Sequence, residues 1–282
     1  MWFSEKALVF VDTRSAALAV YRRGFSGPRL ARFAFERFGS HAGQAALFSD
    51  VLADSRDAIK RLSRELKAPA GDATLLLPLG ASFPSIVDMS ALRQAQATEV
   101  DDADAVRFRL APLLPFPIAQ AEVRTETSSS LGGSAILAQA ILKTTIAESE
   151  KVMASLAFNH AHITSTLSAA LRGLPPRSGT VDVIFGDSAC AIAVRDDRGR
   201  IDAIHLRLLV EGDDRAQRSL DEALRATTEV REIRVLGEDA ASLRNKAPGA
   251  TIQPAFDEPA LRGSADPQQF PFLAVFHEGA SK

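Results

Sequence analysis

The sequence predicts an α/β protein built as two lobes, and three observations lead to this prediction. Short apolar runs that suit buried strands alternate with segments of helical period along the chain. A pair of strand-like runs near the N-terminus recurs about 170 residues later, which indicates duplicated lobes. Between the two copies lies Gly173–Gly179, whose glycines and prolines make it the best candidate linker.

Composition excludes several classes of protein. With 46% hydrophobic residues among 282, the chain can bury one large core or two modest ones. A net charge of −2 lacks the basic surplus of a nucleic-acid-binding protein. The single cysteine cannot form an intrachain disulfide, the N-terminus lacks a signal-peptide layout, and prolines interrupt the longest uncharged stretch, 73–87. We therefore expect a cytoplasmic protein that does not insert into the membrane.

The first lobe is predicted to span residues 1–172. Its opening strands are expected at Ala7–Val11, Ala16–Tyr21 and Arg29–Phe38, followed by a helix over Phe48–Leu66 and a buried strand at Thr74–Leu77. A further short strand near Ile163 and a helix ending at Leu171 complete this lobe.

Residues from about 80 to 160 are predicted to form a separate subdomain inserted into the first lobe, because the character of the sequence changes after Pro78. The expected elements are a helix capped by Ser90 and running to Leu110, strands at Ala121–Thr127 and Ala135–Leu142, and a helix over Ile146–Phe158.

The second lobe is predicted to span residues 173–282. Val183–Gly186 and Ile192–Val194 align without a gap with Val9–Asp12 and Leu18–Val20, although chance similarity between small apolar strands is the alternative. The later elements are expected to be a helix over Ala216–Leu224, a strand at Ile233–Leu236, a helix over Asp239–Lys246, a strand at Thr251–Ile252, and an apolar segment, Phe270–Phe276, packed on the first lobe.

Four of these segments resemble the PilM family, the cytoplasmic actin-like component of the type IV pilus inner-membrane platform. Arg107–Pro117 is similar to that family's helix ending in Pro-Phe-Pro. Three further segments resemble parts of that family. Ile136–Phe158 is similar to its apolar strand and the helix that follows, Val181–Val194 to its second phosphate hairpin, and Ile233–Gly237 to its strand entering the adenosine loop. The resemblance implies an actin-like (ribonuclease H-like) two-lobed fold with an inserted subdomain. The second lobe is expected to be reduced, because 207–229 has room for one helix only.

The same resemblance implies a nucleotide cleft between two hairpin turns, for ATP with Mg²⁺. The residues at the matching positions are Asp12, Thr13, Arg14, Ser15, Gly186, Asp187, Ser188 and Gly237. Phosphate-binding turns need glycine, since backbone N–H groups must approach the phosphates closely. The first turn has Arg14 in place of that glycine, while the second has Ile184 in place of the aspartate and Asp187 displaced by one residue. We therefore predict a vestigial nucleotide cleft, no catalytic residues, no firmly bound cofactor and no ATP hydrolysis.

Other candidate sites fail on residue spacing. Leu142 occupies the glycine position before Lys143, which excludes a Walker loop. His160 and His162 could share a strand face, but no third metal ligand is close in sequence. The acidic run Asp101–Asp104 is best interpreted as a solvated helix face. No metal site is predicted.

A partner site is implied by the resemblance alone. PilM-family proteins bind the short cytoplasmic N-terminal tail of a single-span inner-membrane protein, in a groove between the first lobe and its inserted subdomain. The matching residues here are Leu113, Leu114, Pro115, Phe116 and Pro117. Proline restricts the backbone on both sides of Phe116, so its ring could be presented to a partner at little entropic cost. The alternative is that Phe116 packs beneath the preceding helix.

The function expected from the sequence is that of a cytoplasmic scaffold held at the inner-membrane face by a PilN-like partner. An active actin-like ATPase or small-molecule kinase is one alternative, and it would require both turns to be complete. A cytoplasmic component of a type II secretion-like apparatus is the other. The oligomeric state is left open, a homo-oligomer included.

Overall fold

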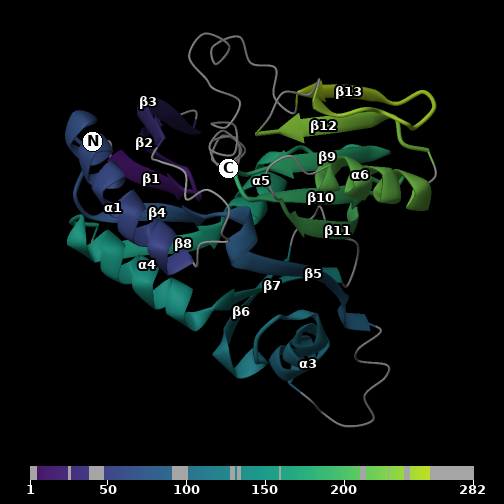
Figure 1. The fold of residues 1–282 in the computed structure, drawn as a ribbon, viewed down its shortest axis with the longest axis horizontal. Coiled ribbons are helices and arrows are strands. Elements are labelled where there is room, and N and C mark those ends of the chain that lie inside the picture. Colours follow the sequence, from purple (N-terminus) through teal and green to yellow (C-terminus); the bar gives the residue numbers. More distant parts are fainter. Residues whose placement is uncertain are drawn as a thin grey trace.

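The structure is a computed structural model that describes residues 5–24, 27–37, 48–90, 101–127, 131, 135–158, 160–209, 214–227, 229–237 and 242–254. Within these residues the strands form three sheets (Figure 1). Two sheets have five strands each, in the orders β3-β2-β1-β4-β8 and β11-β10-β9-β12-β13, and the third has the order β5-β7-β6.

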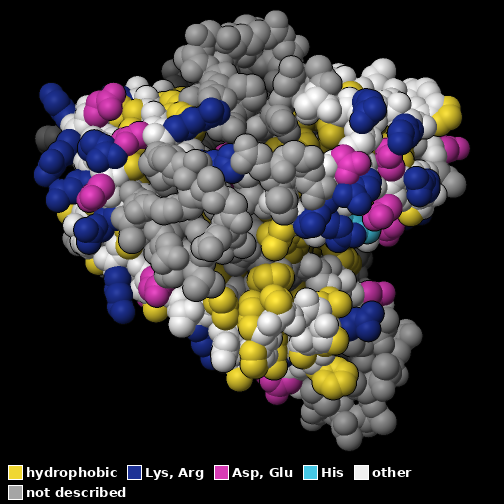
Figure 2. All heavy atoms as spheres, viewed as in Figure 1, with side chains coloured by type: hydrophobic (Ala, Val, Ile, Leu, Met, Phe, Trp, Pro, Cys, Tyr) yellow, Lys and Arg dark blue, Asp and Glu magenta, His cyan; other side chains and the backbone are white. Residues whose placement is uncertain are grey.

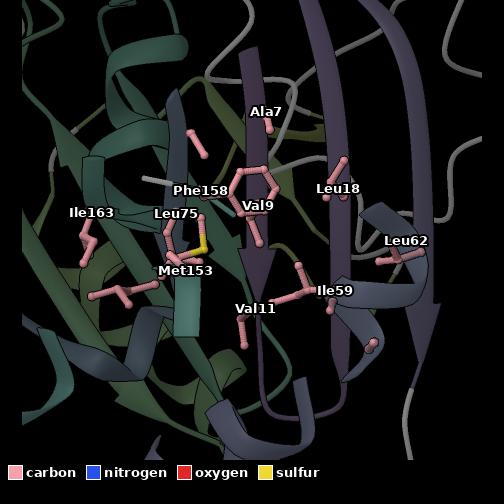
Figure 3. Close-up of a cluster of buried hydrophobic side chains, with 14 of the residues drawn as sticks. Ala7, Val9, Val11, Leu18, Ile59, Leu62, Leu75, Met153, Phe158 and Ile163 are labelled. Atoms are coloured by element: carbon pink, nitrogen blue, oxygen red, sulfur yellow. The ribbon is translucent and has the colours of Figure 1, made fainter. Parts of the chain in front are cut away.

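The first sheet carries the core of the N-terminal half. Its strands are β1 (Glu5–Val11), β2 (Ser15–Gly24), β3 (Gly27–Arg37), β4 (Asp72–Leu77) and β8 (His160–Ser165). Helices α1 (Phe48–Glu65) and α4 (Lys143–Ser155) cover one face, where Ile59, Leu62 and Met153 meet the alternate side chains of β1, β2 and β4 (Figure 3). The strands β1 and β2 are buried on both faces, as their apolar runs predict, and the helical period of α1 and α4 supplies the apolar side chains that pack on this face.

The second sheet repeats the arrangement of the first. Its strands are β9 (Thr180–Phe185), β10 (Ala189–Arg195), β11 (Ile201–Leu208), β12 (Glu232–Leu236) and β13 (Thr251–Pro254). Helix α6 (Arg215–Ala226) covers one face, and α5 (Thr166–Gly173) lies on the other. Ala169 of α5 packs against the first sheet and Leu167 and Leu171 pack against the second, so this buried helix lies between the two sheets (Figure 1).

The third sheet lies between β4 and β8 in the sequence. It consists of β5 (Ser82–Asp88), β6 (Ala121–Glu126) and β7 (Ala135–Leu142), with α3 (Asp102–Leu110) and the short helices η1 (Leu79–Ala81), η2 (Ala111–Leu113) and η3 (Ile118–Gln120). Sequence reasoning missed β5, because Pro84 interrupts its apolar run. Proline is tolerated there because β5 is at the edge of its sheet, with β7 as its partner.

Some predicted elements differ from the structure or lie outside its described part. Ser242 is in a 3-10 helical conformation but residues 243–246 form no helix, so the prediction of a helix over Asp239–Lys246 is wrong in its last four residues. The Asn245 side chain accepts a hydrogen bond from Ala247 N at 2.8 Å, a local turn contact that competes with helix formation. Phe38, residues 91–100, most of the turn at 128–133 and Phe270–Phe276 lie outside the described residues. The division of the chain into two lobes at residue 172 stays a prediction. None of the described helices is long and apolar enough to cross a membrane.

Candidate functional site

The two hairpin turns that carry the predicted nucleotide residues are equivalent in the hydrogen-bond registers of their strands. Val11 pairs with Ala16 before the first turn, and Phe185 pairs with Cys190 before the second. Asp12 N donates to Ser15 O at 2.8 Å in the first turn, and Gly186 N donates to Ala189 O at 2.8 Å in the second. The duplicated hairpin predicted from the sequence is therefore present.

These registers agree with the ungapped alignment, in which Gly186 corresponds to Asp12, since each opens its turn with the same backbone hydrogen bond. They correct one detail of the predicted site. Ile184, assigned to the aspartate position on the sequence, lies inside β9 and is buried in a hydrophobic core. The aspartate of the second turn is Asp187, which corresponds to Thr13.

The two turns face each other and exchange hydrogen bonds. Asp12 Oδ2 accepts from Asp187 N at 2.9 Å. In return, Asp187 Oδ2 accepts from Arg14 N at 3.1 Å and from the Ser15 hydroxyl at 2.9 Å. The structure thus brings the residues predicted from both turns into direct contact, although they are more than 170 residues apart in the chain.

Three backbone N–H groups at the tips of the turns donate to carboxylates of the protein. Thr13 N donates to Asp12 Oδ1 at 2.8 Å, Arg14 N donates to Asp187, and Asp187 N donates to Asp12. A phosphate-binding turn works in the opposite way, because its N–H groups must point at the ligand. In this arrangement the donors are directed at two carboxylates of the protein itself.

Burial changes the acid–base behaviour of this site. The Asp12 side chain is buried, and the loss of solvation raises its pKa to about 7, with the negative charge of Asp187 adding to the increase. The hydrogen bonds that Asp12 accepts from Asp187 N and Thr13 N act in the opposite direction but are weaker. Asp12 is therefore poised to exchange a proton near neutral pH.

Two predicted glycines are required by close contacts. A Cβ at Gly186 would lie 2.6 Å from Asp12 Oδ2, so a larger residue would push the two turns apart. Gly237 has φ of 93°, and a Cβ there would lie 2.4 Å from Phe185 O. Gly237 consequently packs directly against the end of β9, next to the second turn.

Sequence reasoning missed two contributors to this site. Leu79 and Gly80 of η1 pack beside the second turn: a Cβ on Gly186 would lie 3.5 Å from Leu79 Cδ1, and a Cβ on Gly80 would lie 3.7 Å from the Ser188 hydroxyl. The role of Asp187 as a ligand of the first turn was also missed. Pro78, directly after β4, is the signal in the sequence that the strand ends and a turn begins here.

The predicted partner residues lie at the end of α3, on the third sheet. The Phe116 ring is partly buried and packs edge-on against Phe83, with ring centroids 5.4 Å apart. Leu113 is 59% exposed, and Phe108 on α3 is 83% exposed. Figure 2 shows apolar side chains gathered over this part of the molecule, where Figure 1 places the third sheet. Phe116 thus packs on its own core, while Leu113 is the more accessible apolar side chain of the predicted set.

No cluster of three or more metal-binding side chains occurs in the described part of the chain. Asp101 caps α3 by accepting from Ala103 N at 3.2 Å, which fits its interpretation as part of a solvated helix terminus.

Comparison with known proteins identifies the fold. No protein-family model matches the sequence, and no curated protein matches it significantly. A chain of the PilM–PilN type IV pilus biogenesis complex is similar in structure, with a TM-score of 0.66, 16% sequence identity, and coverage of 99% of this chain and 98% of that one.

Two further solved structures are similar over most of their length. The cytoplasmic domain of EpsL, an inner-membrane component of the type II secretion system of Vibrio cholerae, has a TM-score of 0.55 at 9% identity, covering 96% of this chain and 94% of that one. A protein of unknown function from Bacteroides thetaiotaomicron, described as having an actin-like ATPase fold, has a TM-score of 0.57 at 8% identity and covers 84% of each chain. The chain therefore has the actin-like ATPase fold, as its resemblance to the PilM family implies.

Proposed function

We propose that this protein is a cytoplasmic scaffold of a type IV pilus-like assembly platform, held at the inner-membrane face by the cytoplasmic tail of a single-span partner resembling PilN. The observation that carries this proposal is the similarity to a chain of the PilM–PilN complex over 99% of this chain and 98% of that one. A similarity that spans both chains from end to end supports the same overall role better than a similarity confined to one lobe would.

The nucleotide cleft is proposed to be vestigial. Arg14 stands where close phosphate approach needs glycine, and its N–H donates to Asp187. The N–H groups of Thr13 and Asp187 donate to Asp12. A bound phosphate would have to displace both carboxylates and would add negative charge beside them, which is electrostatically unfavourable.

Two edge strands support docking of an extended tail. β8 is at the edge of the first sheet and β6 is at the edge of the third, in the described strand orders. The Arg124 side chain on β6 donates to Ile163 O on β8, so this side chain connects the two edge strands. An extended peptide can add main-chain hydrogen bonds to such an edge while apolar sites bind its alternate side chains. Leu113 and its neighbours on the third sheet would supply apolar contacts.

The partner is tested by calorimetry with synthetic cytoplasmic tails of single-span membrane proteins encoded beside this gene. We expect one tail to bind. Leu113→Asp should weaken its binding at least about tenfold, because a charge would replace apolar surface that the bound tail covers. Leu208→Asp is the matched control, since Leu208 is 53% exposed against 59% for Leu113 but lies on the second sheet. Absence of binding by every tail, or equal loss in both variants, would contradict the proposed site.

The lack of ATP hydrolysis is tested separately. Purified protein is expected to show no Mg²⁺-dependent turnover of ATP above the rate of the Asp12→Ala variant. Turnover that depends on Mg²⁺ and disappears in Asp12→Ala would establish an active ATPase and overturn the vestigial cleft.

A role in a type II secretion-like apparatus is the second candidate, and the similarity to the EpsL cytoplasmic domain favours it. The tail experiment separates the two candidates, because the tails come from different apparatuses. Binding of a tail encoded with type II secretion genes, and of no pilus-type tail, would favour the second candidate.

A further inference from the structure

The junction between the two five-stranded sheets contains an exchange of ligands that the vestigial-cleft proposal does not require. Each turn provides one carboxylate, and each carboxylate accepts hydrogen bonds from the other turn. A turn that had merely lost its phosphate-binding function could leave its donors exposed to water. Here the Asp187 side chain instead accepts from a backbone N–H and a hydroxyl of the first turn, the donor types that bind oxyanions at such turns.

The surroundings of this exchange restrict access of water on one side, while Arg14 and Asp187 are partly buried. Asp12 and Ser15 are buried, and Leu79 packs alongside the Asp12–Gly186 contact. A hydrophobic cluster next to it joins Leu79 and Leu167, which belong to η1 and α5, with Ile184 and Ala189 of the second sheet. Hydrogen bonds in such an environment are stronger than at a solvent-exposed hinge.

We propose that the two turns form a latch in which the Asp187 carboxylate is an internal ligand, occupying the oxyanion position of the first turn and holding the two lobes together without nucleotide. The Asp12 carboxylate completes the latch by accepting from Asp187 N. Opening of the latch would break all the inter-turn hydrogen bonds together and would uncover a turn able to bind an oxyanion. The latch concerns how the lobes are held, so it stands whether or not the proposed tail binds.

Ionisable groups around the latch are few among the described residues. Asp187 faces Asp12 from the second lobe, Arg14 is the cation of the first turn, and η1 carries no ionisable side chain. Arg172, in the last turn of α5, is the basic residue of the helix between the lobes. The contacts between the turns described above are hydrogen bonds to two carboxylates.

Amide hydrogen exchange measured by NMR, corrected for intrinsic rates, can test the latch residue by residue. The amides of Arg14 and Asp187 donate across the junction, whereas those of Asp12 and Gly186 donate within their own hairpins and serve as internal controls. In Asp187→Ala we expect the protection of the Arg14 amide to fall at least about tenfold, because a charged acceptor is lost. Asp187→Asn is the matched control, since its side-chain oxygen can still accept both hydrogen bonds and should preserve protection.

Inorganic tripolyphosphate serves as the probe of the oxyanion position in the first turn, which the Asp187 carboxylate vacates in Asp187→Ala. We expect it to restore protection of the Arg14 amide in Asp187→Ala and to leave the wild-type protein unchanged. Ser15→Ala provides a second variant if Asp187→Ala fails to fold, and it should lower the protection of the Arg14 amide without affecting Gly186.

Three results would overturn the latch. These are unchanged protection of the Arg14 amide in Asp187→Ala and Ser15→Ala, equal loss of protection at the Asp12 and Gly186 amides, or tripolyphosphate acting on the wild-type protein as it acts on Asp187→Ala. Tail binding is measured independently by calorimetry, so failure of the latch leaves the proposed partner untouched, and failure of tail binding leaves the latch untouched.

Discussion

The two five-stranded sheets share a backbone plan but differ in the chemistry of their faces toward α5. Their strand orders correspond, with a central strand flanked by an antiparallel hairpin partner and a parallel neighbour. A register shift also occurs at equivalent places. It lies between Val20 and Tyr21 in the pairing of β2 with β3, and between Val194 and Arg195 in the pairing of β10 with β11.

Three equivalent positions on these faces carry different residues. In the first sheet Leu8 pairs with Thr74, and a side-chain hydrogen bond joins Thr74 to Tyr21. In the second sheet the corresponding residues are Asp182, Arg234 and Arg195. Asp182 accepts from Arg195 Nε at 2.7 Å and from Arg234 Nε at 2.6 Å, and all of these side chains are buried.

The difference shows that strand register does not depend on the chemistry at these positions. In the second sheet the arginines also reach loops: Arg195 Nη1 donates to Gly199 O at 3.0 Å, and Arg234 Nη1 donates to Pro175 O at 2.8 Å. Pro175 belongs to the linker that follows α5. The charged triad thus fixes the linker and the β10–β11 turn to the second sheet.

Removing the Asp182 carboxylate, which both arginines share, should lower the free energy of unfolding more than any other change. Asp182→Ala leaves two buried guanidinium groups without a counter-charge, and we expect the free energy of unfolding to fall by about 3–5 kcal/mol in chemical denaturation. The triple variant Asp182→Leu, Arg195→Tyr, Arg234→Thr copies the first sheet and should recover more than half of that loss. A cost below about 1 kcal/mol for Asp182→Ala would show that the triad is not a structural ion cluster.

The pH dependence of the free energy of unfolding should reveal the raised pKa of Asp12 in the first turn. The pKa of Asp12 is raised from 3.8 to about 7 in the folded protein, so the native state keeps a proton that the unfolded state loses. The stability contribution of Asp12 is then full below about pH 4 and falls as pH rises to about 7, by at most about 1.4 kcal/mol per pH unit.

The measurement compares denaturation of wild type and Asp12→Asn from pH 4 to pH 8, because other carboxylates act in the opposite sense. The pKa values of Asp196 and Asp221 are lowered by their hydrogen bonds and nearby cations, despite a desolvation effect that raises them. These contributions cancel in the difference between the two proteins. A difference that does not change with pH would contradict the raised pKa of Asp12.

The contact between the turns should be sensitive to one methyl group. Gly186→Ala places a Cβ 2.6 Å from Asp12 Oδ2, and we expect a loss of about 1–3 kcal/mol in the free energy of unfolding. Gly80→Ala is the matched control, because its Cβ would meet the flexible end of the Leu208 side chain at 3.2 Å and should cost less. Equal costs would indicate that the turns can separate freely.

The smallest expected effect is in the first sheet. Tyr21→Phe removes the hydrogen bond to Thr74 but keeps the ring, so we expect a loss of about 1 kcal/mol in thermal or chemical unfolding. A loss as large as that of Asp182→Ala would mean that the two sheets rely equally on polar contacts at these positions.

The sequence by itself determined most of the local structure. Short apolar runs identify both hairpins, because strands that are buried on both faces are apolar at successive positions. Helical period identifies α1 and α6, and glycine and proline mark the linker after α5. The actin-like fold was implied by the resemblance of four segments, Pro115–Pro117 among them, to the PilM family.

Only the tertiary structure decided how the candidate site is used. Asp187 looked displaced by one residue in the sequence, yet that position lets its carboxylate reach the first turn. The charged triad combines residues from β9, β10 and β12, and no local pattern marks their meeting. Both features depend on contacts between segments far apart in the chain. The energy of such contacts comes from burial and geometry that exist only after the two sheets have closed on α5.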